Sequence, residues 1–147
     1  MSWQPYRIDD CARQVVLQAL QRDPKGESLS QVFKMRVTCA YGLERFWGEY
    51  LRLKQKPAER NKAEIIYDTW RFMSEEILAD TGIDLPFDPD LDPSARGNQQ
   101  AVRNSLEKFW ELRTTQPYQA QVALSVLTTF CEAIIWWKNR LSVKQGA

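Results

Sequence analysis

Apolar residues recur at three- and four-residue spacings along most of the chain, which is the pattern of a helix with one buried face. In the first such stretch the apolar residues are Ile8, Cys11, Ala12, Val15, Val16, Ala19 and Leu20. Asp9 and Asp10 fall near its beginning, where carboxylates favour the amide end of a helix, and Asp23-Pro-Lys-Gly26 ends it. We therefore expect a first helix from about residue 8 to residue 22.

A second stretch begins near Ser28 or Ser30, both suitable N-caps, and keeps the helical spacing to about Gln55. Its apolar residues are Leu29, Val32, Phe33, Val37, Ala40, Leu43, Phe46, Trp47, Tyr50 and Leu51. Gly42 and Gly48 lie inside this stretch, and each costs a helix on the order of 1 kcal/mol relative to alanine. We expect one long helix, with a bend or a close approach of another helix at these glycines.

Pro57 ends the second helix and opens a third, since proline lacks only an amide hydrogen that would be unpaired in a first helical turn. The apolar residues of the third helix are Ala63, Ile66, Tyr67, Trp70, Met73, Ile77 and Leu78. Gly82 is placed to adopt the left-handed conformation just past its end. The third helix is therefore expected from Pro57 to about Leu78.

Residues 82–97 break the helical pattern. They include DLPFDPDLDPSARG, which holds three prolines and four aspartates in fourteen residues. Prolines at this density are incompatible with a helix or a central strand, and aspartate favours turns. We expect an acidic Pro/Asp-rich loop between the third and fourth helices.

Two more helices complete the pattern, the fourth from about Gln99 to Arg113 and the fifth from Pro117 to about Leu141. The fourth is expected to bury Val102, Leu106, Phe109, Trp110 and Leu112. The fifth has little polar surface, which is typical of a central helix or of one that faces a partner. No internal repeat or strand alternation interrupts the pattern. The sequence therefore predicts an all-α fold, a single-domain bundle of about five helices over residues 1–147.

The residue types argue against catalysis. The chain has no histidine, which removes the commonest general base and the commonest transition-metal ligand. Asp88, Asp90 and Asp92 have the spacing of the first ligands of a calcium loop, but the glycine position is Pro93 and the glutamate position is Gln99. We expect a protein that is not an enzyme and that needs no metal, cofactor or small-molecule substrate. An enzyme that works through carboxylates alone is the catalytic alternative.

The cysteines indicate a reducing compartment. Cys11, Cys39 and Cys131 are odd in number, lie far apart and sit among apolar residues, so we expect buried free thiols. The amino terminus has no apolar core behind a basic start, and no apolar run reaches the ~18 residues that a membrane span requires. The sequence therefore predicts a soluble, cytoplasmic protein without a membrane partner.

Charge is distributed unevenly, although the net charge is only +1. Residues 33–72 hold nine cations and five anions, whereas residues 73–98 hold one cation and seven anions. Such a separation suits electrostatic registration between neighbouring copies of the chain or with a polyanion.

The cations concentrate around Pro57, in the stretch YLRLKQKPAERNK that covers residues 50–62. Convergent cations without an equal number of acids are what a phosphate backbone requires. Glu49, Glu59 and Glu64 reduce the excess, so the alternative is a solvated junction between two helices. The candidate nucleic-acid contacts are Arg45, Arg52, Lys54, Lys56, Arg60 and Lys62.

Six tryptophans are more than one core of this size needs. Tryptophan supplies a large contact area and is enriched at the centres of interfaces. The candidates for exposed protein contacts are Trp3, Trp47 and one of the pair Trp136 and Trp137. The alternative is that all six tryptophans belong to the core.

A histidine-free bundle of five helices, with YLRLKQKPAERNK and RNKAEIIYDTWRF as a basic segment and an acidic loop behind it, resembles the small subunits of CRISPR effector complexes of the Cascade and type III kind. The resemblance is one of size and organisation over most of the chain, without a diagnostic motif. It implies a non-catalytic subunit that stacks in two or more copies and contacts backbone-forming subunits. It also implies cations lying along a guide–target heteroduplex or a displaced DNA strand. The alternative is a protein-only adaptor or assembly factor that docks a partner through Trp136, Trp137 and the acidic loop.

Overall fold

All regular elements in the described part of the chain are helices. A computed structural model describes residues 5–86 and 97–141. The α-helices in these ranges are α1 (Pro5–Arg22), α2 (Gln31–Thr38), α3 (Leu43–Lys54), α4 (Arg60–Phe72), α5 (Gln99–Thr115) and α6 (Pro117–Leu141). Three-ten turns precede α2, α3 and α4, and the π-helical turn Met73–Ile77 extends α4. The prediction of an all-helical protein is confirmed, with six helices in these ranges where about five were expected.

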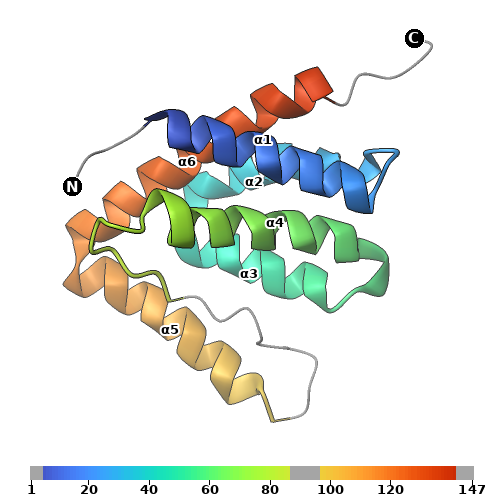
Figure 1. Cartoon of the computed structure of the whole chain (residues 1–147). Coiled ribbons are helices and arrows are strands. Elements are labelled where there is room, and N and C mark those ends of the chain that lie inside the picture. Colours follow the sequence, from blue (N-terminus) through green and yellow to red (C-terminus); the bar gives the residue numbers. More distant parts are fainter. Residues whose placement is uncertain (1–4, 87–96, 142–147) are drawn as a thin grey trace.

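The helices surround one hydrophobic core, to which each of them contributes buried side chains. Helix α1 packs along α6 and against α4, while α2 packs against α6 and α4 (Figure 1). Helix α3 lies against both α4 and α5, and α5 turns back onto α6. The expected acidic loop falls mostly on residues 87–96, which lie outside the described residues.

The prediction of one long second helix is wrong, because the chain breaks at Gly42. Helix α2 ends in the three-ten turn Cys39–Tyr41, and α3 begins after Gly42, whose φ is 98° and ψ 173°. This combination is open essentially to glycine alone. The break explains the additional helix, and it also changes which face of α2 is buried. Phe33 and Val37 are 44% and 64% exposed instead of lying in the core.

The two glycines of this region should respond in opposite ways to substitution. Gly42→Ala is expected to lower the free energy of unfolding by about 1–3 kcal/mol, because a side chain is strained at this φ and ψ. Gly48→Ala is the matched control, since Gly48 lies inside α3 and an added Cβ would meet no atom within 4 Å. There alanine should raise the free energy of unfolding by about 1 kcal/mol. Urea denaturation measures both values, and equal effects would contradict the break at Gly42.

The ends of the helices follow the sequence closely in most other places. Gly82 has a φ of 79°, as expected for a residue just past the third predicted helix. Helix α6 has the predicted bounds, and α5 runs on to Thr115. Helix α1 begins at Pro5, earlier than expected, so Asp9 and Asp10 lie in its second turn. Asp10 there accepts a hydrogen bond from Arg13 at 2.7 Å.

All three cysteines are buried free thiols, as predicted. Burial raises the pKa of Cys11 to about 11. The sulfur atoms of Cys39 and Cys131 lie 3.8 Å apart, and the Cys39 thiol also donates to the carbonyl oxygen of Met35 at 3.3 Å. The contact with Cys131 ties the turn before Gly42 to α6.

Helix α6 is the most apolar helix of the described ranges. By length and composition alone, it is long and apolar enough to cross a membrane. A core helix of a soluble protein passes the same test. Its buried side chains are Ala120, Ala123, Val126, Leu127, Phe130, Cys131 and Ile134. Helix α6 also packs against α1, α2 and α5, so part of its apolar surface lies in the core of the bundle.

Candidate nucleic-acid interface

A tight turn at Pro57 folds α4 back against α3. Lys56 is extended, with φ −110° and ψ 110°, as expected for a residue that precedes proline. The amide of Lys56 donates a hydrogen bond to the carbonyl oxygen of Leu53 at 3.1 Å. The amide of Glu59 donates one to the carbonyl oxygen of Lys56 at 2.9 Å. The cations at the end of α3 and at the beginning of α4 are therefore brought to the same corner of the bundle.

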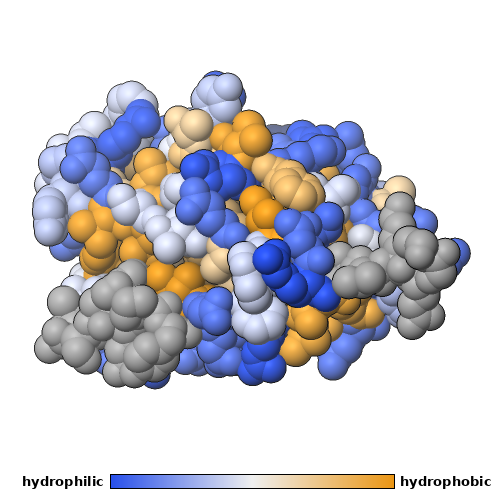
Figure 2. Space-filling view, turned by 90° about the horizontal axis from the view of Figure 1, so that it is seen from above, coloured by the Kyte–Doolittle hydropathy of each residue, from blue (hydrophilic) through white to orange (hydrophobic). Residues whose placement is uncertain are grey.

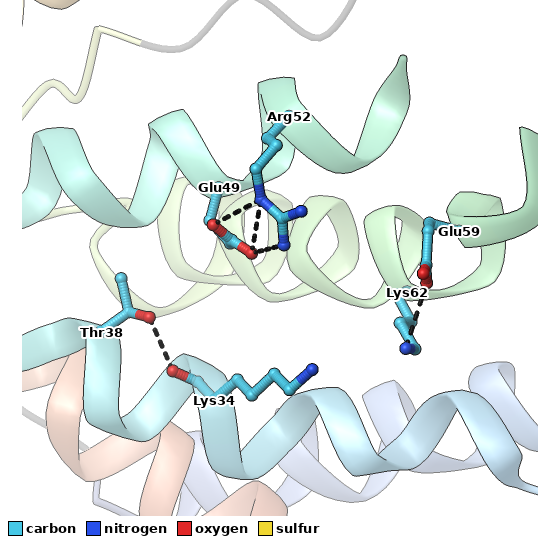
Figure 3. Close-up of polar contacts among 6 residues, drawn as sticks. All are labelled: Lys34, Thr38, Glu49, Arg52, Glu59 and Lys62. Atoms are coloured by element: carbon cyan, nitrogen blue, oxygen red, sulfur yellow. Dashed lines mark hydrogen bonds and ion pairs between the residues drawn. The ribbon is translucent and has the colours of Figure 1, made fainter. Parts of the chain in front are cut away.

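Glu59 is paired with Lys62 and also lies within electrostatic range of Lys34, Lys56 and Arg52. The Lys62 amino group lies 3.1 Å from this carboxylate and lowers its pKa, chiefly through a hydrogen bond. The charges of Lys34 and Lys56 act on Glu59 in the same direction, and Glu59 in turn acts on Arg52. Figure 3 shows Lys34 on α2, Arg52 on α3, and Glu59 with Lys62 at the beginning of α4.

Arg52 is held on the surface of α3 by Glu49. Its Nε donates to the two carboxylate oxygens of Glu49 at 3.2 and 3.1 Å (Figure 3). This hydrogen bonding raises the pKa of the Arg52 guanidinium. The side chain is half exposed, and ion pairs at exposed positions are typically worth only about 0–1 kcal/mol. A phosphate could therefore replace Glu49 as the partner of Arg52 at little cost.

We call Lys34, Arg52, Lys54, Lys56, Arg60 and Lys62 the basic patch. Lys56 and Arg60 are exposed, and the Lys54 amino group lies 5.5 Å from the centre of the Tyr50 ring. The nearby acids are Glu49, Glu59 and Glu64, so cations are in excess. Lys34 was missed by sequence reasoning because it lies on α2, far from Pro57 in the chain. No local sequence pattern could have identified it.

Arg45, a predicted member of the set, does not lie with the cations around Glu59. It precedes Arg52 by two helical turns, which places it about 10 Å away along α3. Its guanidinium lies 5.4 Å from the centre of the Tyr41 ring. Arg45 also lines a groove between α3 and α5, next to Glu49. The groove and the basic patch are therefore neighbours on the surface of α3.

The prediction of Trp47 as an exposed protein contact is wrong. Its side chain is fully buried, and its Nε1 donates to the hydroxyl of Ser105 on α5 at 3.1 Å. The ring stacks on Tyr50 at 4.8 Å and lies 6.2 Å from Trp70. Trp47 is buried because both α4 and α5 cover its face of α3.

The other predicted tryptophan contacts have different environments. Trp3 lies outside the described residues. Trp137 is partly buried, and its Nε1 donates to the Asp9 carboxylate at 2.8 Å, which ties α6 to α1. Trp136 is 47% exposed and lies under the guanidinium of Arg140 at 4.1 Å. Of the pair, Trp136 is the exposed residue.

Trp110 was predicted to be buried and is instead 56% exposed. Ser105 and Phe109 on α5 point into the core. Trp110 follows Phe109 and points about 100° further around the helix, away from the core. The Arg113 guanidinium lies 4.3 Å from the centre of the Trp110 ring. Sequence reasoning therefore placed Trp47 on the surface and Trp110 in the core, which is the reverse of their positions in the structure.

Several other large apolar side chains are exposed. Figure 2 shows patches of hydrophobic surface between hydrophilic residues on the face seen from above. Phe33, Val37 and Tyr41 are 44%, 64% and 59% exposed, and they follow one another at four-residue steps along α2 and the turn behind it. We call these three residues the α2 stripe. Such a stripe is typical of a surface that contacts another protein.

The described residues form no metal centre, and the chain has no match among known proteins. Within residues 5–86 and 97–141, no group of three or more His, Cys, Asp or Glu side chains could hold a metal ion. Asp88, Asp90 and Asp92 lie outside these ranges. The chain matches no family model, no curated protein and no solved structure.

Proposed function

We propose that the protein is a non-catalytic small subunit of a nucleoprotein complex, of the CRISPR effector kind, and that its basic patch binds the nucleic-acid backbone. The observation that carries this proposal is the basic patch at the turn between α3 and α4, where cations outnumber the nearby acids Glu49, Glu59 and Glu64. Cations that neutralise phosphates gain affinity by counterion release and do not read bases. The subunit works in the cytoplasm, needs no cofactor, and binds DNA or RNA of any sequence.

The arrangement of charge along α4 supports stacking of several copies. Helix α4 (Figure 1) and its π-helical turn cover 13 and 5 residues, about 25 Å. The basic patch lies at the beginning of this helix. The acids at and beyond the other end are Glu75, Glu76, Asp80 and Asp84. Glu75 forms an ion pair with Arg71 at 3.6 Å, and Glu76 forms one with Arg7 at 3.5 Å. Both carboxylates are exposed. Opposite charges at the two ends suit a head-to-tail contact between copies.

A protein-only adaptor is the second candidate function. The α2 stripe and Trp136 favour it, because both expose large apolar area that a partner protein could bury. In an adaptor the cations of the basic patch are solvated, and nucleic acid plays no part in the assembly.

Purification of the tagged protein from the cells that naturally make it distinguishes the two functions. We expect a multi-subunit assembly that carries nucleic acid and that yields protected fragments after nuclease treatment. Identification of the bound proteins and sequencing of the fragments provide the measurement. An assembly that contains proteins alone, and whose size nuclease does not change, would favour the adaptor.

A further inference from the structure

A groove of about 530 Å³ lies between α3 and α5. Leu106 and the exposed ring of Trp110 form one wall, and Gly48 lies on the opposite side, on α3. Arg45 and Arg103 contribute their side chains to the same lining. The groove thus combines an exposed aromatic ring, apolar surface and two guanidinium groups.

Gly48 keeps this groove open. Its φ is not in the left-handed region, so the backbone does not require glycine there, and an added Cβ would meet no atom within 4 Å. Neither the conformation nor the packing of the described chain explains a glycine that weakens α3 relative to alanine. A side chain at this position would project into the groove. The space above Gly48 is therefore available to a bound group.

The groove is lined by two cations, Arg45 and Arg103, and by three acids, Glu44, Glu49 and Glu107. Glu44 is held by Arg113 at 2.9 Å, and Glu49 is held by Arg52. Among the described residues, the lining charges that are in no ion pair are Arg45, Arg103 and Glu107. Through Glu49 and Arg52 the groove adjoins the basic patch, where the phosphates of the proposed function lie.

We propose that the groove receives an unpaired nucleobase, stacked on Trp110, from a strand whose phosphates lie on the basic patch. Proteins that bind single strands combine aromatic rings for stacking with cations that follow the backbone. A duplex keeps its bases stacked and paired, so it cannot fill the groove without unpairing. The proposal rests on the proposed function and adds to it that the bound nucleic acid is single-stranded at this point.

The test compares oligothymidylate with an abasic oligomer of equal length, which has the same phosphates and no bases. Fluorescence anisotropy measures the affinity of the isolated chain at low salt and of the native assembly. The oligomer with bases should bind roughly 5- to 100-fold more tightly than the abasic one. Trp110→Ala, which removes the ring, and Gly48→Leu, which fills the groove, should each abolish this preference. Trp136→Ala is the matched control, because it removes an exposed ring under an arginine outside the groove, and it should preserve the preference.

The outcomes separate the groove from the basic patch. Equal, salt-dependent affinity for both oligomers would overturn the nucleobase proposal and leave the proposed function standing. Absence of binding to either oligomer, in the chain and in the assembly, would overturn both. If Trp110→Ala and Gly48→Leu leave the preference unchanged but release a partner protein from the assembly, the groove is a protein contact and the proposal is wrong.

Discussion

Replacing Trp47 by alanine is expected to lower the free energy of unfolding by about 3–5 kcal/mol, the usual range for removal of a buried large aromatic ring. The side chain is fully buried at the junction of α3, α4 and α5. Alanine would remove its contacts with Tyr50, Trp70 and Phe109 and leave a cavity between the three helices. Urea or thermal denaturation followed by circular dichroism measures the change.

Two further variants test the contributions of the Trp47 hydrogen bond and of its burial to the free energy of unfolding. Ser105→Ala removes the hydroxyl that accepts from the indole N–H and should cost about 1–3 kcal/mol. Trp136→Ala truncates a half-exposed tryptophan and should cost less than Trp47→Ala. If the Trp47 and Trp136 variants lose equal stability, the assignment of Trp47 to the core is incorrect.

Replacing Arg52, Lys56 and Arg60 together by alanine is expected to weaken nucleic-acid binding on the order of 100-fold near 0.1 M salt. All three side chains are exposed, so the fold and the thermal midpoint should change little. The loss should be nearly equal for unrelated sequences, because contacts to the backbone carry no base information. Affinity is best measured in the assembled complex, where neighbouring subunits add their own contacts.

The matched control replaces Arg13, Lys108 and Arg140, which are exposed cations on α1, α5 and α6. It removes the same charge from other parts of the surface. A loss of affinity confined to the variant of the basic patch therefore reports on that patch and not on net charge. Equal losses in both variants would mean that the protein attracts nucleic acid only through its overall charge.

The sequence predicts those features of the fold that depend on local chemistry. Pro57 and Pro117 mark helix beginnings because a first turn needs no amide hydrogen at that position. Gly82 marks a helix end because it adopts positive φ without strain. The three-and-four spacing locates the buried faces of α1 and α4 for the same reason, since it depends only on the geometry of one helix.

Features that depend on the packing of distant segments could not be predicted. Gly42 and Gly48 lie in the same apolar pattern, yet one breaks the helix and the other lies within it. Likewise, Trp47 is buried and Trp110 exposed because of the way α5 packs on α3, which neither residue's neighbours in sequence reveal.

In the candidate site too, residues close in sequence could be grouped in advance, whereas contributions from distant helices could not. Arg52, Lys56 and Lys62 could be grouped from the sequence because Pro57 forces a reversal between them. Lys34 and the groove next to Arg45 could not, because α2 and α5 reach this surface only in the folded chain.

The salt dependence of binding tests most directly whether the basic patch holds phosphates. The logarithm of the affinity is measured against the logarithm of the salt concentration for the unchanged assembly and for the assembly with Arg52, Lys56 and Arg60 replaced by alanine. Each lost phosphate contact should reduce the slope by roughly 0.7 to 0.9, so the triple variant should lose roughly 2 to 3 units of slope with either of two unrelated sequences. An unchanged affinity and an unchanged slope in a normally assembled variant would contradict the phosphate contacts and favour the protein-only adaptor.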